Sequence, residues 1–141
     1  HNLVGHGLTS LMEQLTTAVA INVPATAAWE LLIDTRRWPE WGPSVARVDC
    51  ADHCIGQGTV GRVQTAFGPW LSFQITEFIA GQYWHWKVAG IPATGHRVLS
   101  IGPSLCRVVF EVPVLAAPYL IVCRLAVQRI KNILEEERHP V

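Results

Sequence analysis

The pattern of apolar and polar positions begins with a β–α unit. Thr16–Asn22 is rich in apolar and β-branched residues, which predicts a first strand. Pro24 opens a helix that runs to Asp34, because proline is tolerated at a helix start and the apolar residues behind it share one helical face. Residues 36–43 are interrupted by prolines and a glycine, and they predict one short turn of helix.

The middle of the chain changes to a strand pattern. Turns that contain Gly or Pro separate short β-like segments, and such tight turns between successive strands indicate an antiparallel meander. Gly90-Ile91-Pro92 is expected to interrupt the pattern after one of these strands. The predicted strands are Ser44–Cys50, Thr59–Phe67, Trp70–Ile79, Tyr83–Val88, His96–Ile101 and Leu105–Val112.

A long amphipathic helix closes the chain. Over Pro118–Glu137, apolar residues that include Val122, Ala126 and Ile130 recur at helical spacing. A sheet needs a covered face, and this helix is the obvious cover. The order of elements therefore predicts an α+β fold. In it, a curved antiparallel sheet wraps around a long C-terminal helix, and two short helices follow the first strand.

Several short motifs occur in a particular order along this pattern. They are Ile21-Asn22-Val23-Pro24-Ala25-Thr26, Trp29-Glu30-Leu31-Leu32 with Asp34, Trp38-Pro39-Glu40-Trp41, Gly58-Thr59-Val60-Gly61, the strand with Trp84 and Trp86, and the closing helix. Together they resemble the START/birch-pollen-allergen superfamily (SRPBCC), specifically its polyketide cyclase/dehydrase-like branch. The resemblance covers roughly Thr16–Glu137, which is nearly the whole chain.

The resemblance implies a helix-grip fold with a cavity between sheet and long helix for a hydrophobic small molecule. Members of the superfamily include lipid carriers, plant hormone and alkaloid binders, and aromatase/cyclases. No universal catalytic motif accompanies the resemblance, and a shared fold does not establish a shared function.

Composition narrows the classes of protein that fit. The chain has 141 residues, of which 50% are apolar and 16% charged, so it is not intrinsically disordered and suits a single domain. We expect that domain over residues 13–141, after an N-terminal extension of residues 1–12 without clear periodicity. The net charge is zero, so no broad positive field favours nucleic acid or an anionic membrane as a partner.

Targeting and cysteine patterns favour a cytoplasmic protein. The apolar stretch Val112–Cys123 has about 12 residues, short of the roughly 20 that span a bilayer, and no signal-peptide pattern is visible. The cysteines match no disulfide framework, so we expect reduced thiols. Cys50, His53 and Cys54 suit zinc, but a fourth ligand at matching spacing is missing, so neither a metal nor a cofactor is expected.

Alternation along the strands predicts which side chains face the cavity. Lys87, Arg97 and Arg107 mark the solvent face of three strands, so their sequence neighbours face inward. These inward residues are Trp84, Trp86, His96, Val98, Ser100, Cys106, Val108 and Phe110. The wall is therefore apolar and aromatic with one polar group, His96, as in many small-molecule pockets. The predicted ligand contacts are Trp29, Phe73, Ile75, Trp84, Trp86, His96, Val98, Val108, Phe110, Val122, Ala126 and Ile130.

Two of the functions that fit place a small molecule in the cavity. The first is a non-catalytic binder of a hydrophobic or aromatic molecule, lipid or polyketide-like, which needs only a cavity and a few orienting groups. The second is a polyketide cyclase or dehydratase with His96 as candidate acid or base, and Glu77, Tyr83 and Glu111 as more distant candidates. A buried histidine held by a hydrogen-bonded partner is the plainer interpretation of His96.

The third function is a homodimeric interaction module with a filled core. Some apolar residues lie outside the main stripe of the closing helix, and they either form a dimer surface or are buried on a second side. They are Leu120, Ile121, Leu125 and Val127. Trp38 and Trp41 fall where relatives have a cavity entrance, but we expect them to plug the end of the sheet.

Overall fold

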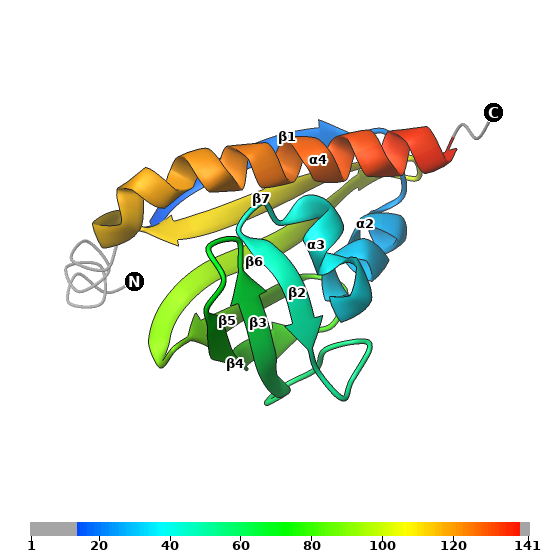
Figure 1. Cartoon of the computed structure of the whole chain (residues 1–141). Coiled ribbons are helices and arrows are strands. Elements are labelled where there is room, and N and C mark those ends of the chain that lie inside the picture. The colour runs from blue at the N-terminus through cyan, green and yellow to red at the C-terminus, as the bar shows by residue number, and fades with distance from the viewer. Residues whose placement is uncertain (1–13, 139–141) are drawn as a thin grey trace, which may run out of the picture.

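One antiparallel sheet of seven strands dominates the computed structural model, which describes residues 14–138 (Figure 1). Its strand order is β1-β7-β6-β5-β4-β3-β2, so the first strand pairs with the last and β2 forms the opposite edge. The strands are β1 (Gln14–Ile21), β2 (Val45–Asp49), β3 (Val60–Thr65), β4 (Trp70–Ile79), β5 (Tyr83–Val88), β6 (Ile91–Gly102) and β7 (Leu105–Pro113). The predicted N-terminal extension, residues 1–12, lies outside the described residues.

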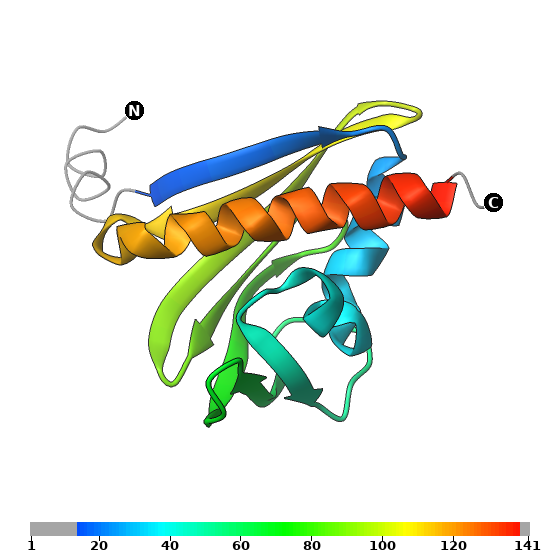
Figure 2. The same ribbon diagram turned by 45° about the horizontal axis from the view of Figure 1, so that its top comes forward.

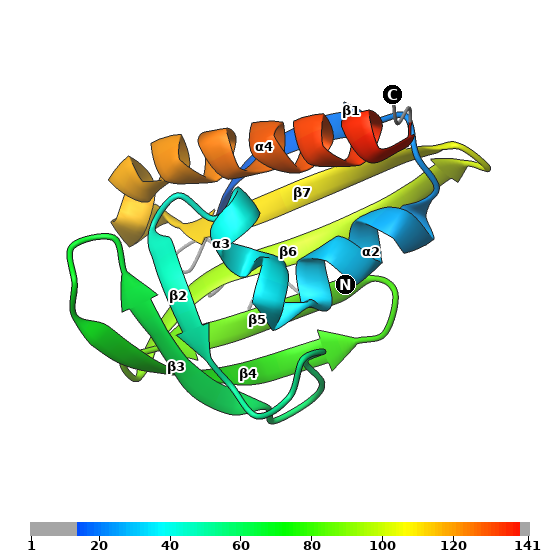
Figure 3. The same cartoon turned by 45° about the vertical axis from the view of Figure 1, so that its right-hand side comes forward.

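The helices lie on one side of this curved sheet. They are α2 (Ala25–Ile33), α3 (Trp38–Trp41) and α4 (Leu120–Arg138), with 3-10 turns η1 (Thr35–Arg37) and η2 (Val114–Tyr119). Figures 2 and 3 show α4 running along β1 and β7, with α2 and α3 on the same side of the sheet. The predicted α+β helix-grip architecture is confirmed. Within residues 14–138, no helix has both the length and the apolar character needed to cross a bilayer.

Strand β7 shows how alternating side chains create the face of the sheet that packs against the helices. Cys106, Val108, Phe110 and Val112 are all buried, as the water-facing position of Arg107 predicts. They pack beneath α4, whose Ile130 is fully buried. The same rule fails at Ser100, which is exposed because it lies near the β6–β7 turn, where the register shifts between Ser100 and Gly102.

The start of β6 differs from the prediction. Gly90-Ile91-Pro92 was expected to break the strand pattern, but the reversal occurs at Ala89 and Gly90, which both adopt positive φ. The strand therefore begins at Ile91 and is twelve residues long. Pro92 is tolerated there because it pairs with Lys87 beside a register shift, where one ladder hydrogen bond is dispensable.

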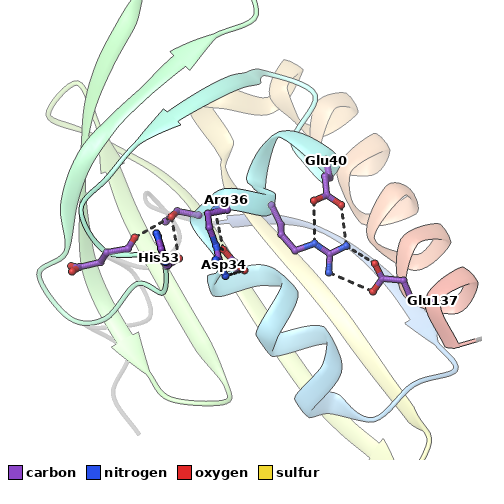
Figure 4. Close-up of polar contacts among 8 residues, drawn as sticks. Asp34, Arg36, Glu40, His53 and Glu137 are labelled. Carbon is purple, nitrogen blue, oxygen red and sulfur yellow. Dashed lines mark hydrogen bonds and ion pairs between the residues drawn. The ribbon is translucent and has the colours of Figure 1, made fainter.

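Ion pairs connect the C-terminal end of α4 to the short helical segments η1 and α3. Arg37 forms ion pairs with Glu40 of α3 and with Glu137 of α4, at 2.9 and 2.5 Å, and Figure 4 shows both carboxylates around one guanidinium. Next to it, Asp34 accepts from the backbone and side chain of Arg36. The Arg36 hydrogen bond holds the pKa of Asp34 below its usual value.

The loop between β2 and β3 docks on η1 through its backbone. Thr35 Oγ1 donates to the carbonyls of Asp52 and His53 at 3.0 Å, and its own N–H donates to His53 O at 2.7 Å (Figure 4). Among residues 14–138, no group of three or more His, Cys, Asp and Glu side chains is placed to hold a metal ion.

Candidate ligand-binding site

The space between sheet and helices is divided into a small inner cavity and a larger outer cleft. The inner cavity has a volume of about 30 Å³, enough for about one water molecule. Its wall comes from α3, β5, β6, β7 and α4. The lining residues are Trp38, Trp41, Gly42, Pro43, Ser44, Val45, Trp84, Trp86, Thr94, His96, Phe110, Tyr119, Val122, Cys123 and Ala126.

The outer cleft adjoins the inner cavity and lies near the point where η2 leads into α4. Its volume is about 480 Å³, its surface is overwhelmingly apolar, and none of its lining residues is charged. Small and branched side chains leave this space open. The lining residues are Ser44, Val45, Val63, Thr65, Phe67, Leu71, Trp86, Val88, Ala89, Ile91, Pro92, Ala93, Thr94, Val112, Pro113, Ala116 and Tyr119.

Stacked aromatic rings fill most of the middle of the grip. Trp38 stacks on Trp84 with ring centroids 5.4 Å apart, and His96 stacks on Trp84 at 3.7 Å. Trp41 meets Phe110 edge-on at 5.6 Å. Trp38 is 1% and Trp41 6% exposed, so both indoles enter the core and reduce the inner cavity to its small size.

A chain of hydrogen bonds fixes the protonation of His96. The Trp84 carbonyl can only accept, so the proton of the neutral ring lies on Nδ1, 3.2 Å from that oxygen. Nε2 is then an acceptor for the Thr94 hydroxyl at 2.9 Å, and Thr94 Oγ1 accepts from Trp86 Nε1 at 2.9 Å. Burial lowers the pKa of His96 to about 3, so the ring is neutral at physiological pH.

The boundary between cavity and cleft contains a second polar pair. Ser44 Oγ and Tyr119 Oη lie 2.5 Å apart and join the segment before β2 to the last residue of η2. Burial raises the pKa of Tyr119, and the Ser44 hydrogen bond partly offsets this. Ser44, Val45, Trp86, Thr94 and Tyr119 line both spaces, so the inner cavity and the outer cleft adjoin.

Only part of the predicted ligand-contacting set lines these spaces. Trp84, Trp86, His96, Phe110, Val122 and Ala126 line the inner cavity, and Trp86 also lines the cleft. The others lie in the packed core and contribute to neither wall. They are Trp29, Phe73, Ile75, Val98, Val108 and Ile130, each at most 9% exposed.

Sequence reasoning missed most of the cleft. Thr94 lies two residues before His96 on the same strand face, so the strand period finds it once β6 is started at Ile91. Thr65 and Val88 stand at or near strand ends, where alternation says little about contact. Ala116 lies in η2, which carries no strand or amphipathic signal.

The other candidate acids and bases lie away from both spaces. Tyr83 precedes inward-facing Trp84, so its ring is on the outer face of the sheet, where its hydroxyl donates to Glu111 at 3.1 Å. Burial, together with the negative charge of Glu111, raises the pKa of Tyr83. Arg97 covers the Tyr83 ring at 4.3 Å and pairs with Glu111 at 3.5 Å. Glu77 is exposed.

A family model identifies the family, and solved structures support the fold. The family model described as "Polyketide cyclase / dehydrase and lipid transport" matches residues 12–132. No curated protein matches the sequence.

Solved structures resemble the fold at low sequence identity. The Zhui aromatase/cyclase from Streptomyces sp. R1128 gives a TM-score of 0.71 at 14% identity, covering 91% of this chain and 96% of its own. The protein XoxI from Bacillus cereus gives 0.70 at 14%, covering 92% and 100%. A norcoclaurine synthase point mutant from Thalictrum, in complex with a transition-state analogue, gives 0.61 at 11%, covering 90% and 96%. At such identities the likeness concerns the fold alone.

Proposed function

The chain belongs to the polyketide cyclase/dehydrase and lipid transport family, and from this premise we propose that it binds a small, uncharged, hydrophobic or aromatic molecule in the outer cleft. The observation that carries the proposal is the cleft itself, about 480 Å³ in volume and lined without a single charged residue. Ligand pockets of drug-sized molecules have volumes of about 300–1,000 Å³ and mostly apolar walls.

The character of the lining argues for a neutral ligand. An ionised group moved from water into an apolar wall loses its hydration and needs a partner of opposite charge. The cleft offers the hydroxyls of Ser44, Thr65, Thr94 and Tyr119, which can orient a polar atom but cannot neutralise an ion. A lipid or a polyketide-like aromatic without a buried charge fits this wall.

Binding is favoured over catalysis because acid–base groups are engaged elsewhere. The alternative function, a cyclase or dehydratase, needs a group that exchanges a proton with the substrate at working pH. Both ring nitrogens of His96 are occupied by protein partners, and burial lowers its pKa to about 3. Tyr83 and Glu111 bond to each other on the outer face.

The experiment compares two neighbouring alanines of η2. Ala116 lines the cleft, whereas Ala117 does not, and both are exposed. Ala116→Trp places an indole in the cleft and is expected to weaken binding of the neutral fluorescent probe N-phenyl-1-naphthylamine about tenfold or more, a loss of about 1.4 kcal/mol. Ala117→Trp is the matched control and is expected to bind like wild type. Equal affinity in both variants refutes the cleft as the site.

Native mass spectrometry of the gently purified protein identifies the natural ligand class. A bound mass that is extracted by organic solvent, and that Ala116→Trp prevents from binding, supports the proposal. A bound molecule that Ala116→Trp retains at wild-type occupancy places the ligand elsewhere and refutes it.

Homodimerisation is a separate proposal. Ile121 and Leu125 of α4 are 65% and 51% exposed, whereas Val127 is buried in the core. Exposed apolar side chains on one helix face form a contact surface in many proteins. Leu125→Glu is then expected to shift a concentration-dependent sedimentation coefficient to the monomer value. An unchanged coefficient at two concentrations refutes the dimer. A cytoplasmic location stays a prediction from cysteine usage.

A further inference from the structure

The buried polar side-chain atoms that lack a partner gather at the candidate site. Within residues 14–138 they are Trp41 Nε1, Trp84 Nε1 and Thr65 Oγ1. Trp41 and Trp84 line the inner cavity, and Thr65 lines the outer cleft. Buried polar atoms almost always have partners in folded proteins, so unpartnered ones in a hollow require an explanation.

Two neighbouring tryptophans have hydrogen-bonded indoles, so a missing partner is not common to the tryptophans between sheet and helices. Trp38 Nε1 donates to the carbonyl of Leu32 at 2.9 Å, and Trp86 Nε1 donates to Thr94 Oγ1 at 2.9 Å. Trp41 and Trp84 are buried as deeply, at 6% and 0% exposure. Because an indole N–H only donates, the group that would satisfy either of them must be an acceptor.

The polar side chains beside these two donors are bonded to one another. Thr94 donates to His96 and accepts from Trp86, while Ser44 bonds Tyr119. Among the described side chains that line the inner cavity, the buried atoms without a partner are therefore two donors, Trp41 Nε1 and Trp84 Nε1, and no side-chain acceptor. With no charged residue in its lining, the inner cavity suits a neutral acceptor better than a carboxylate or a phosphate.

We propose that the inner cavity is a subsite for one carbonyl oxygen of the ligand, bound by the Trp41 and Trp84 indole N–H groups. This inference rests on the proposed function, because the apolar body of the ligand occupies the adjoining outer cleft. The cavity volume of about 30 Å³ suits an oxygen-sized group and not a ring. The ligand class is thus an apolar ketone or quinone. Its oxygen lies in the inner cavity, and its rings lie in the outer cleft.

The test uses two bicyclic probes that differ in one group. 1-Tetralone carries a ketone where tetralin carries a methylene, so comparing them isolates the oxygen. Calorimetry gives both dissociation constants for wild type and for Trp41→Phe, which keeps an aromatic ring and removes the N–H. Since one neutral hydrogen bond contributes about 0.5–1.5 kcal/mol, the preference for tetralone is expected to fall about 2–10-fold in Trp41→Phe.

Trp70→Phe is the matched control, because Trp70 lies outside both linings, beside Arg62 on the sheet. Its tetralone-to-tetralin ratio is expected to equal that of wild type. The ratio also cancels any general loosening that a smaller ring causes, since such loosening affects both probes.

Indole N–H resonances report the bonds directly. In a ¹H–¹⁵N spectrum, the Trp41 and Trp84 signals, assigned by their loss in Trp41→Phe and Trp84→Phe, are expected to move downfield with tetralone and not with tetralin. If Trp84→Phe does not fold, the Trp41 signal alone decides. Equal shifts with both probes, or binding of tetralone without any shift because a resident water keeps the donors, overturn the carbonyl subsite. Failure of both probes to bind overturns the carbonyl subsite, whereas the proposed function is tested separately by N-phenyl-1-naphthylamine with Ala116→Trp.

Discussion

Because His96 is neutral in the folded protein, the free energy of unfolding should depend on pH. A substitution of His96 by a residue that does not titrate should remove this dependence. His96 is 2% exposed, and burial lowers its pKa to about 3 from the usual 6.5. The folded protein therefore keeps the ring neutral, whereas the unfolded chain protonates it below about pH 6.5. The ring favours the folded state fully above pH 6.5, and this preference is lost as the pH falls towards 3.

The magnitude follows from the two pKa values. Between pH 7 and pH 5 the unfolded chain takes up most of one proton at this site, and the folded protein takes up almost none. Integrated over that interval, His96 lowers the free energy of unfolding by about 2 kcal/mol. Such a loss is a large part of a typical domain stability of about 5–15 kcal/mol.

Urea unfolding at pH 7 and pH 5 measures the effect. Wild type is compared with His96→Asn, whose amide retains a donor for the Trp84 carbonyl but cannot take up a proton. The variant is expected to lose about 2 kcal/mol less than wild type between the two pH values, whatever its stability at pH 7. His53→Asn, which removes an exposed histidine on the loop after β2, is the control and should behave like wild type.

An equal loss in wild type and His96→Asn would falsify the argument, because carboxylates common to both would then account for the whole pH dependence. A second readout is the ¹⁵N spectrum of the ring. At pH 5, His96 should still give the signature of a neutral imidazole with its proton on Nδ1. An imidazolium signature at that pH contradicts the hydrogen-bond chain to Thr94.

Three further predictions concern stability measured by urea unfolding. Ile75→Ala should cost about 2–5 kcal/mol, and Ile79→Ala in the same strand less than about 1, because Ile75 is fully buried and Ile79 is 51% exposed; equal costs contradict this difference in burial. Gly61→Ala should cost about 1–3 kcal/mol, because its Cβ would lie 2.8 Å from Asp49 O, whereas Gly56→Ala, with nothing within 4 Å, should be nearly neutral. Arg37→Ala should cost under about 1 kcal/mol, and 1 M salt should shrink that difference; a salt-independent loss points to packing instead.

The fold was predictable because the strands carry their own markers of orientation. Arg97 and Arg107 alternate with buried neighbours and Lys87 with half-buried ones, so the inner face could be assigned from charge alone. The error at β6 has a local cause. Ala89 adopts a positive φ, which is rare for a residue other than glycine, so the turn closes one position earlier than Gly90-Ile91-Pro92 suggests.

The candidate site was less predictable, because its shape depends on how large rings share a limited space. Nothing in the spacing of Trp38 and Trp84 reveals that their rings stack at 5.4 Å and close the middle of the grip. Alternation along a strand predicts that a side chain faces inward. It does not distinguish a residue packed in the core, such as Ile75, from a residue that lines the cleft, such as Trp86. The unpartnered indoles had no sequence signal at all.

The composition of the outer cleft supports the proposed binding function. Stacked rings occupy the middle of the grip, and the open space moves to the end built from Val88, Ala93 and Ala116. Any reacting atom in that cleft meets apolar carbon and the hydroxyls of Ser44, Thr65, Thr94 and Tyr119. Burial raises the pKa of Tyr119, so it does not act as a base at neutral pH. Such a wall supplies hydrogen bonds that orient a neutral ligand. It therefore supports the proposed binding of a ligand rather than proton transfer to it.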